Sequence, residues 1–321
     1  MYFIGDNITG DKRMEQIIDT IFKGLQNMKD NTVLFVPYFV FLIFVLALSF
    51  IVGIFIGYFW VVGADISSIL PAAVVVSFVL LILTILISSY VTAGTIGMAK
   101  EAIATGTTTL KDMFKYGRQY TVRVFIATIL LLIIQSVCVI FWLPLYSAYK
   151  NTGYTFNVII DAFYQLMMEN IDPFITVVSD LAVALFVPFM IGSLLTLVYT
   201  VIISIVFYFI QEPIVVDDMP VIAAFKKSVA LLRQYPVKVI FFIVLIYLLM
   251  FALSSLFNMF TMAFSMSVIL SLIASLLQVV ATIAISVAVL VWSTRFYMAI
   301  NEKEIYGNEN LPDYESSSIE N

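Results

Sequence analysis

The sequence contains no histidine and a single cysteine, Cys138, in 321 residues. Histidine is the side chain most often used for general acid–base catalysis and for metal binding, so its absence removes the usual residue for both kinds of site. One cysteine excludes a disulfide within the chain. Cys138 lies inside an apolar run, where a buried and unreactive thiol is expected rather than a nucleophile.

Charged residues are also scarce, and long apolar runs take their place. Asp, Glu, Lys and Arg make up 12% of the chain and hydrophobic residues 62%, whereas a soluble domain carries about 25% charged residues. Several runs exceed the roughly 20 residues that a helix needs to cross a bilayer. The first 30 residues are acidic and lack a continuous apolar stretch, so we expect no cleavable signal peptide.

The apolar runs predict an all-α fold, a polytopic bundle of six transmembrane helices. Lipid offers no partner to free backbone groups, and the runs lack the alternation of barrel strands, so each span must be helical. We predict spans at about 32–62, 69–98, 120–147, 174–210, 237–263 and 267–299. This membrane domain, 31–300, is flanked by an N-terminal segment, 1–30, and by an acidic tail, 301–321, which we expect to be disordered.

Short amphipathic segments precede the first, third and fifth spans, at about 12–29, 109–117 and 219–234. Each places apolar residues at helical spacing and basic residues on the remainder of the helix. Helices of this kind lie in the headgroup layer or pack against the ends of the spans, and for 12–29 we favour the headgroup layer. Thr109 and Asp112 are spaced as a helix cap.

The third amphipathic segment has the most distinct faces. Its apolar positions form one stripe: Ile222, Phe225, Val229 and Leu232. Its basic positions are predicted on the opposite side: Lys226, Lys227 and Arg233.

One short motif occurs twice. Residues 118–124 read RQYTVRV and residues 233–239 read RQYPVKV, so five of seven positions are identical. Each copy follows an amphipathic segment and opens a long apolar run. We interpret the chain as three parallel repeats of surface helix, span and span, of which the first lacks the motif. The alternative is chance similarity, because basic and aromatic residues are common where a chain enters a membrane.

The distribution of basic residues predicts the orientation. Of the 16 Lys and Arg residues, only Lys150 lies in a segment on the opposite side from the others. The positive-inside rule therefore places both termini in the cytoplasm, in a cell membrane. The largest segment on the outer side, 148–173, has partly helical spacing of apolar residues, and we expect a short helix there.

Two groups of polar residues are candidate sites. Basic residues near the starts of spans are candidate contacts for lipid headgroups: Arg118, Arg123, Lys226, Lys227, Arg233 and Lys238. Polar residues within spans are a candidate intramembrane site: Gln135, Asp180 and Gln278. Helix-to-helix hydrogen bonds are the simpler expectation for the two glutamines.

The segments Glu212–Asp217 (EPIVVD) and Ala223–Ser228 (AAFKKS), followed by Leu231 and Leu232, carry a resemblance. They resemble the six-span membrane domain attached to some glycerophosphoryl diester phosphodiesterases, and related bacterial and archaeal membrane proteins of unknown function. The resemblance implies fold and location only, because the phosphodiesterase is a separate soluble domain with histidine and acidic residues. No catalytic residue is carried over.

We therefore expect a non-enzymatic membrane protein, with no catalytic, cofactor or metal site, that contacts lipid or acts as an interaction scaffold at the cytoplasmic face. Its expected partners are membrane lipids, anionic ones among them, and a membrane or cytoplasmic protein, but not nucleic acid. Basic surface helices attract anionic lipid by about 1 kcal/mol per Lys or Arg. The alternative is a transporter or the membrane subunit of a transport system.

Overall fold

The computed structural model describes residues 10–62, 66–168, 171–263, 268–303 and 305, and every regular element within them is a helix. The expected disorder of the acidic tail concerns residues that lie, from 306 on, outside this description. Within the described ranges, six segments are long and apolar enough to cross a membrane. The predicted all-α fold with six spans is confirmed, and the chain is a multi-pass membrane protein.

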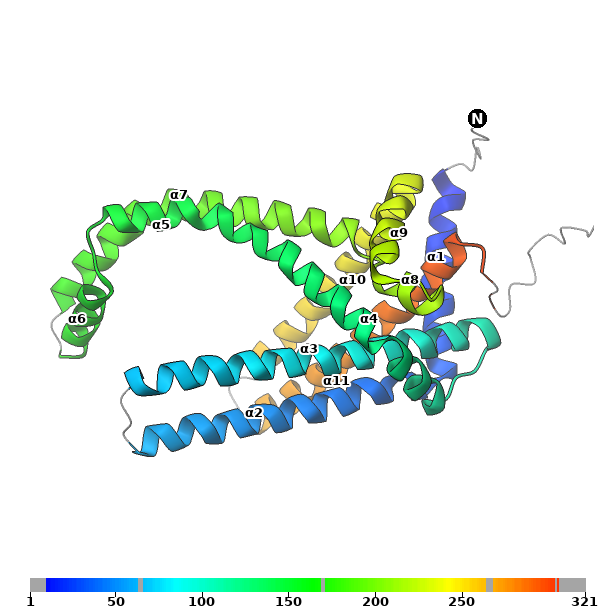
Figure 1. The fold of residues 1–321 in the computed structure, drawn as a ribbon, viewed down its shortest axis with the longest axis horizontal. Coiled ribbons are helices and arrows are strands. Elements are labelled where there is room, and N and C mark those ends of the chain that lie inside the picture. Colours follow the sequence, from blue (N-terminus) through cyan, green and yellow to red (C-terminus); the bar gives the residue numbers. More distant parts are fainter. Residues whose placement is uncertain (1–9, 63–65, 169–170, 264–267, 304, 306–321) are drawn as a thin grey trace, which may run out of the picture. The chain divides into compact units, whose positions relative to one another are not determined.

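The helices follow one another along the chain as drawn in Figure 1. They are α1 (Gly10–Asp30), η1 (Thr32–Phe35), α2 (Val36–Val62), α3 (Ile66–Thr105), α4 (Leu110–Ser136), η2 (Val137–Trp142), α5 (Leu143–Asn151), α6 (Phe156–Met167), α7 (Ile171–Val206), α8 (Gln211–Val216), α9 (Val221–Gln234), α10 (Pro236–Ala263) and α11 (Val268–Ile300). They form two compact units. The terminal unit comprises residues 1–128 and 209–321, and the central unit comprises residues 129–208.

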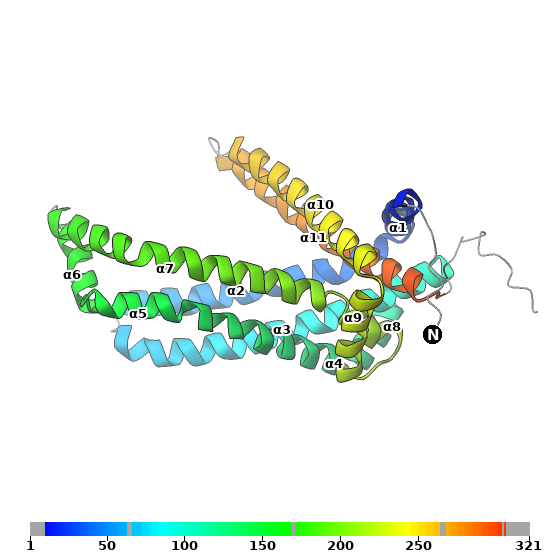
Figure 2. The same cartoon turned by 90° about the horizontal axis from the view of Figure 1, so that it is seen from above.

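The terminal unit contains two helical hairpins, α2 with α3 and α10 with α11. Figure 2 shows α10 and α11 side by side along their length. Aromatic rings join α10 and α11 to the segment before α8. Phe242 and Phe296 stack with ring centroids 4.0 Å apart, and Phe209 lies 5.6 Å from Phe296. These rings are almost completely buried, so they form the core of this unit.

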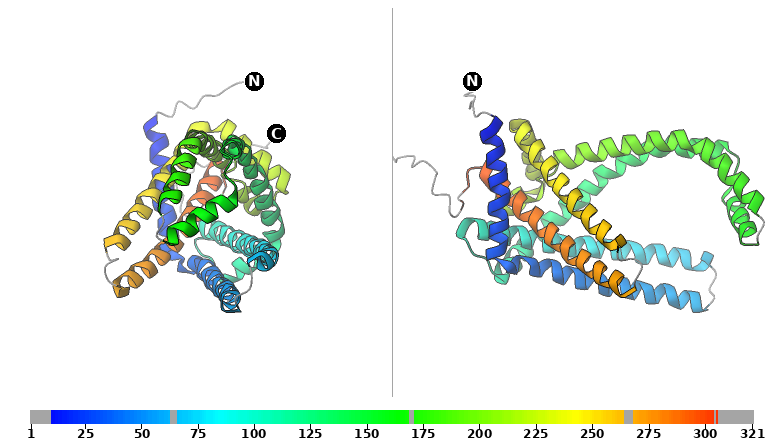
Figure 3. Two further views of the ribbon diagram at one scale, coloured as in Figure 1. Left: turned by 90° about the vertical axis from the view of Figure 1, so that its left-hand side faces the viewer. Right: turned by 180° about the vertical axis from the view of Figure 1, so that it is seen from behind.

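The N-terminal helix α1 packs on α11 (Figure 3). Gly24 has no side chain, and this allows the Trp292 indole to approach so closely that its Nε1 donates a hydrogen bond to the Ile21 carbonyl at 3.0 Å. The helix therefore adopts the packing that we considered the alternative to the headgroup layer. It still exposes apolar side chains, with Phe22 66% and Ile18 42% exposed.

The third predicted amphipathic segment is the separate helix α9, but the second, 109–117, is not separate. It forms the first turns of α4, which continues into the span without a break. The Thr109 N–H donates to Asp112 Oδ2 at 2.8 Å and satisfies one donor before the helix begins. Two glycines of α3 bring α4 close, because a Cβ at Gly97 would lie 2.1 Å from Tyr116 Cγ and a Cβ at Gly94 would lie 2.9 Å from Met113 Cγ.

The central unit holds the rest of the third span and most of the fourth. The predicted span 120–147 is not one helix, because α4 gives way to the 3₁₀ helix η2 before α5 begins with a proline in its first turn. Proline has no N–H to continue an α-helical ladder. The Tyr199 hydroxyl of α7 donates to the Ile134 carbonyl at 2.6 Å, just before this change. Helix α6 lies within residues 148–173, where we expected a short helix.

Candidate functional site

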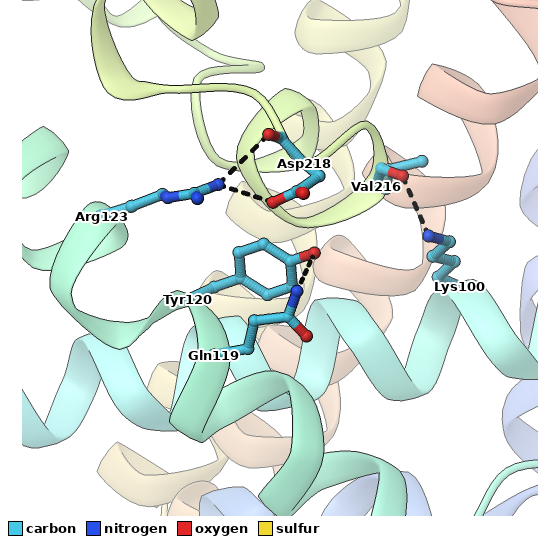
Figure 4. Close-up of polar contacts among 6 residues, drawn as sticks. All are labelled: Lys100, Gln119, Tyr120, Arg123, Val216 and Asp218. Carbon is cyan, nitrogen blue, oxygen red and sulfur yellow. Dashed lines mark hydrogen bonds and ion pairs between the residues drawn. The ribbon is translucent and has the colours of Figure 1, made fainter.

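The first copy of the repeated motif lies on α4 and forms an ion pair with the loop after α8 (Figure 4). Arg123 Nη1 donates to Asp218 Oδ1 at 2.6 Å and to the Asp218 carbonyl at 3.2 Å. The guanidinium also lies 5.8 Å from the centre of the Tyr120 ring. Gln119 Nε2 donates to the Tyr120 hydroxyl at 2.9 Å. Arg123 is thus held from two sides, by an aromatic face and by a carboxylate.

Asp218 reaches Arg123 because its backbone is left-handed, with φ 55°. Aspartate adopts this conformation more readily than most residues other than glycine. The backbone N–H groups of Asp217 and Met219 both donate to the Pro213 carbonyl, and this closes the turn after α8. Lys100 Nζ of α3 donates to the Val216 carbonyl at 2.9 Å, as Figure 4 shows, and secures the same turn.

The second copy, at the junction of α9 and α10, forms the same local contacts. Gln234 Nε2 donates to the Tyr235 hydroxyl at 3.2 Å, and Lys238 Nζ lies 5.7 Å from the centre of the Tyr235 ring. Among the described residues, no carboxylate forms an ion pair with Lys238 in the way that Asp218 pairs with Arg123. Both copies therefore have a cation beside an aromatic ring, but only the first has a described carboxylate, Asp218, paired with that cation.

The two copies also have matching burial. Val122 and Val237 are each 65% exposed, whereas Val124 and Val239 are 0% and 1% exposed. The motif therefore presents the same side to the interior in both places, although its backbone is helical throughout in α4 and interrupted at Tyr235 before α10.

Helix α9 packs through a different face from the one we predicted. Ala224, Ser228 and Leu231 are buried, because two small residues allow this side of the helix to approach its neighbours closely. The predicted apolar stripe is largely on the surface, with Ile222 62% and Val229 44% exposed.

The basic residues of α9 are also placed differently from the prediction. Lys226 follows Ile222 by four residues and Arg233 follows Val229 by four, so these cations lie beside the exposed apolar stripe rather than opposite it. Both are exposed, and Lys227 is half-buried. Arg118, in the first turns of α4, is exposed as well. An exposed apolar stripe with cations one turn away suits a membrane interface, where long basic side chains extend to the headgroups.

The segment EPIVVD, which carried the family resemblance, forms α8 and is buried from Glu212 to Val216. Glu212 is 3% exposed, and its Oε2 atom has no hydrogen-bond partner among the described residues. Asp217, at the end of α8, accepts a hydrogen bond from the Tyr297 hydroxyl and forms an ion pair with Lys303 at 3.0 Å. These contacts make α8 a structural link between α11 and the loop that holds Arg123.

The candidate intramembrane residues are divided between the two units, Gln278 in the terminal unit and Gln135 and Asp180 in the central unit. Gln278 forms hydrogen bonds within the hairpin of α10 and α11, donating to Asn258 at 3.2 Å and accepting from Thr261 at 3.3 Å. Gln135 lies in the central unit, one residue before α4 ends. Asp180 also belongs to the central unit and is exposed.

A tyrosine between α5 and α6 forms a hydrogen bond with Asp180. The Tyr154 hydroxyl donates to Asp180 Oδ2 at 2.7 Å. This hydrogen bond to a carboxylate raises the pKa of Tyr154, because losing the proton would place two negative charges together. An apolar cavity of about 470 Å³ lies nearby in the central unit, between α5 and α7.

Sequence reasoning named Arg123 and Lys238 but missed Tyr120, Tyr235 and Asp218. The repeated tyrosine was a usable signal, because an aromatic residue three positions before a cation lies on the same helix face. Asp218 carried no such signal, since its role depends on a contact with a residue 95 positions away.

Comparison with known proteins identifies a family but no activity. No curated protein and no solved structure matches this chain. A family profile matches residues 16–300, which include all six candidate spans, and it shows no link to glycerophosphoryl diester phosphodiesterases. The chain therefore belongs to the family described as Domain of unknown function (DUF7847).

Proposed function

We propose that this protein is a non-enzymatic membrane protein whose basic face, formed by α9 and the starts of α4 and α10, contacts anionic lipid at the cytoplasmic surface of the cell membrane. The observation that carries this proposal is on α9. Lys226 and Arg233 lie beside exposed Ile222 and Val229, while Ala224, Ser228 and Leu231 pack inward. The apolar stripe suits the acyl boundary and the cations suit the phosphates above it.

The repeated motif supports the same function. Both copies place a cation over a tyrosine ring beside an exposed valine. Aromatic and basic residues are the side chains that anchor membrane proteins at the interface. The matching cation–ring contacts and the matching burial of the valines also support the proposal that the chain is built from repeats. If the seven residues were similar by chance, the two copies would not be expected to share their contacts or their burial.

The test removes three charges from α9. In the variant Lys226→Gln, Lys227→Gln, Arg233→Gln, native mass spectrometry of the purified protein should show weaker retention of phosphatidylglycerol. The size of the effect follows from about 1 kcal/mol per exposed cation near an anionic surface. Retention of the zwitterionic lipid phosphatidylcholine should not change.

A matched control removes three lysines outside this face, two exposed and one half-buried as in α9: Lys29→Gln, Lys150→Gln and Lys23→Gln. Equal retention of phosphatidylglycerol by both triple variants would reject α9 as the lipid-contacting face. Loss of a bound protein from the α9 variant, with lipid retention unchanged, would replace the lipid with a protein partner.

A transport role is the alternative, and no observation favours it specifically. Gln278 bonds its neighbours in one hairpin, and Asp180 accepts a hydrogen bond from Tyr154. Contacts of this kind suit helix packing as well as they suit a pathway.

A further inference from the structure

The first copy of the repeated motif, residues 118–124, shows how the motif binds an anion. In the first copy, the Asp218 carboxylate forms an ion pair with the Arg123 guanidinium. The Tyr120 hydroxyl accepts a hydrogen bond from Gln119, so its own proton remains available for an acceptor. The motif thus offers an anion two groups three residues apart, the Arg123 cation and the Tyr120 hydroxyl. In this copy the anion is Asp218 of the chain itself.

The second copy has the same donors without the anion. The Tyr235 hydroxyl accepts from Gln234, as Tyr120 does from Gln119, and its proton has no acceptor among the described residues. Lys238 contacts the Tyr235 ring and forms no ion pair with a described carboxylate. Glu302, the acidic residue after α11, has φ 54° like Asp218 after α8, but the ion pairs of the described residues do not join it to Lys238.

The surface beyond Lys238 is apolar. Val237, Phe241, Val244 and Leu248 follow one another at helical spacing on α10, and they are 65%, 36%, 45% and 59% exposed. A molecule bound at Lys238 therefore meets a charged end and a continuous apolar stripe. A phospholipid has the same two parts, with a phosphate at the end of acyl chains, whereas free phosphate has only the first.

We propose that Lys238 and Tyr235 bind the phosphate of an anionic phospholipid whose acyl chain lies along α10, and that Asp218 takes the place of this phosphate in the first copy. This proposal rests on the proposed lipid-contacting function and identifies a defined site within it. Tyr235 donates its hydroxyl proton to a phosphate oxygen, and Lys238 neutralises the charge. Lysine binds phosphate as a compact cation, and arginine at Arg123 suits the fixed carboxylate partner.

The experiment compares the binding of phosphatidylglycerol to the full chain by native mass spectrometry over a lipid titration. Lys238→Gln should weaken the tightest binding step about fivefold, the equivalent of one cation near the surface. Lys238→Arg should retain the binding, and Tyr235→Phe should weaken it by less than Lys238→Gln. Lys29→Gln, which removes an exposed lysine elsewhere, is the control and should match the native chain.

The first copy allows a test in the opposite direction. Asp218→Asn removes the internal anion and leaves Arg123 and Tyr120 in place, so the variant should bind one further phosphatidylglycerol. A second variant, Asp218→Asn with Arg123→Gln, should lose that additional lipid. The control is Asp218→Asn with Lys29→Gln, which has the same net charge as the second variant but keeps Arg123. It should retain the additional lipid, so a loss confined to the Arg123 variant distinguishes an anion site from a general effect of charge.

Two results would overturn the proposal. Identical titrations for Lys238→Gln and Lys29→Gln, with no additional lipid on Asp218→Asn, would show that the motif does not bind phosphate. Displacement of phosphatidylglycerol by inorganic phosphate at equal concentration would identify a free-phosphate site and reject the lipid. The proposed function is tested separately: it fails if the triple α9 variant retains as much lipid as its control. Failure of the α9 face and failure of the Lys238 site can therefore be told apart.

Discussion

Single glycines determine how closely α3 and α4 approach in the terminal unit. The nearest neighbours of Gly97 are the Cβ and Cγ atoms of Tyr116, which belong to the rigid base of a side chain rather than to its mobile end. Tyr116 is itself buried and donates a hydrogen bond to Glu101. A larger residue at position 97 must therefore move the two helices apart, because neither the glycine nor the tyrosine has room to adjust.

We predict that Gly97→Ala destabilises the protein by about 1–3 kcal/mol, the usual cost of overpacking a core. The thermal unfolding midpoint of the detergent-solubilised protein should fall. Gly53→Ala is the matched control, since a Cβ at Gly53 meets nothing within 4 Å. This change in α2 should leave the midpoint unchanged or raise it through better helix propensity. Equal midpoints for the two variants would contradict the close approach of α3 and α4.

At the scale of elements, one substitution between the motif copies explains their different backbones. Position 121 is threonine within α4, and the equivalent position 236 is proline at the start of α10. A residue before proline avoids the helical conformation, and Tyr235 has φ −128° and ψ 52°. The proline therefore separates α9 from α10, whereas threonine lets α4 continue.

Exchanging these two residues should have unequal effects. Thr121→Pro removes the N–H of a helix interior and places the proline ring against the Gly117 carbonyl, so we expect a loss of about 3 kcal/mol or more. Pro236→Thr should change stability by less than about 1 kcal/mol, because the first residue of a helix has no intrahelical partner for its N–H. Chemical unfolding followed by circular dichroism measures both. Similar losses for the two variants would contradict the assigned backbones.

Other elements show where prediction from the sequence succeeds and where it fails. The length of the apolar runs located all six spans, because every backbone group in lipid must be hydrogen-bonded within the span, which makes each span a long apolar helix. The packing face of α9 was wrong, since its stripe of large apolar residues faces outward and two small residues face inward. Periodicity identifies an apolar side, but it does not distinguish lipid from protein as the neighbour. The pairing of Arg123 with Asp218 depended on the turn after α8, which no local pattern specified.

Three helix ends share one backbone feature. Each of α3, α8 and α11 is followed within two residues by a positive φ angle: Gly106 at 83°, Asp218 at 55° and Glu302 at 54°. Helices commonly end in this way, and α5 is followed by the same feature at Gly153, with φ 75°. The angles therefore do not mark unit boundaries, and the repeat remains a prediction that rests on the motif.

At the scale of the whole molecule, burial within the terminal unit is concentrated at one end of its long helices. In α11, Val287, Val291 and Tyr297 are almost completely buried, while Ile269 and Leu276 are 73% and 59% exposed. The helix α3 changes in the same way, from exposed Val75 to buried Ile96. At 40 residues, α3 is about 60 Å long, against a hydrocarbon core of roughly 30 Å. The packed end, which carries both motif copies, therefore lies at or beyond one surface of the bilayer.

The positions of the basic residues predict which surface this is. An even number of spans returns the chain to its starting side, and the positive-inside rule predicts that this side is cytoplasmic. The prediction is tested by labelling single cysteines in intact cells with a membrane-impermeant maleimide, in a Cys138→Ala background. Lys150→Cys should react in intact cells, and Lys29→Cys and Lys227→Cys only after permeabilisation. All three positions are described as exposed or half-buried, so reactivity reports their side of the membrane. The reverse pattern would place both motif copies at the outer surface and would contradict the proposed lipid contact at the cytoplasmic face.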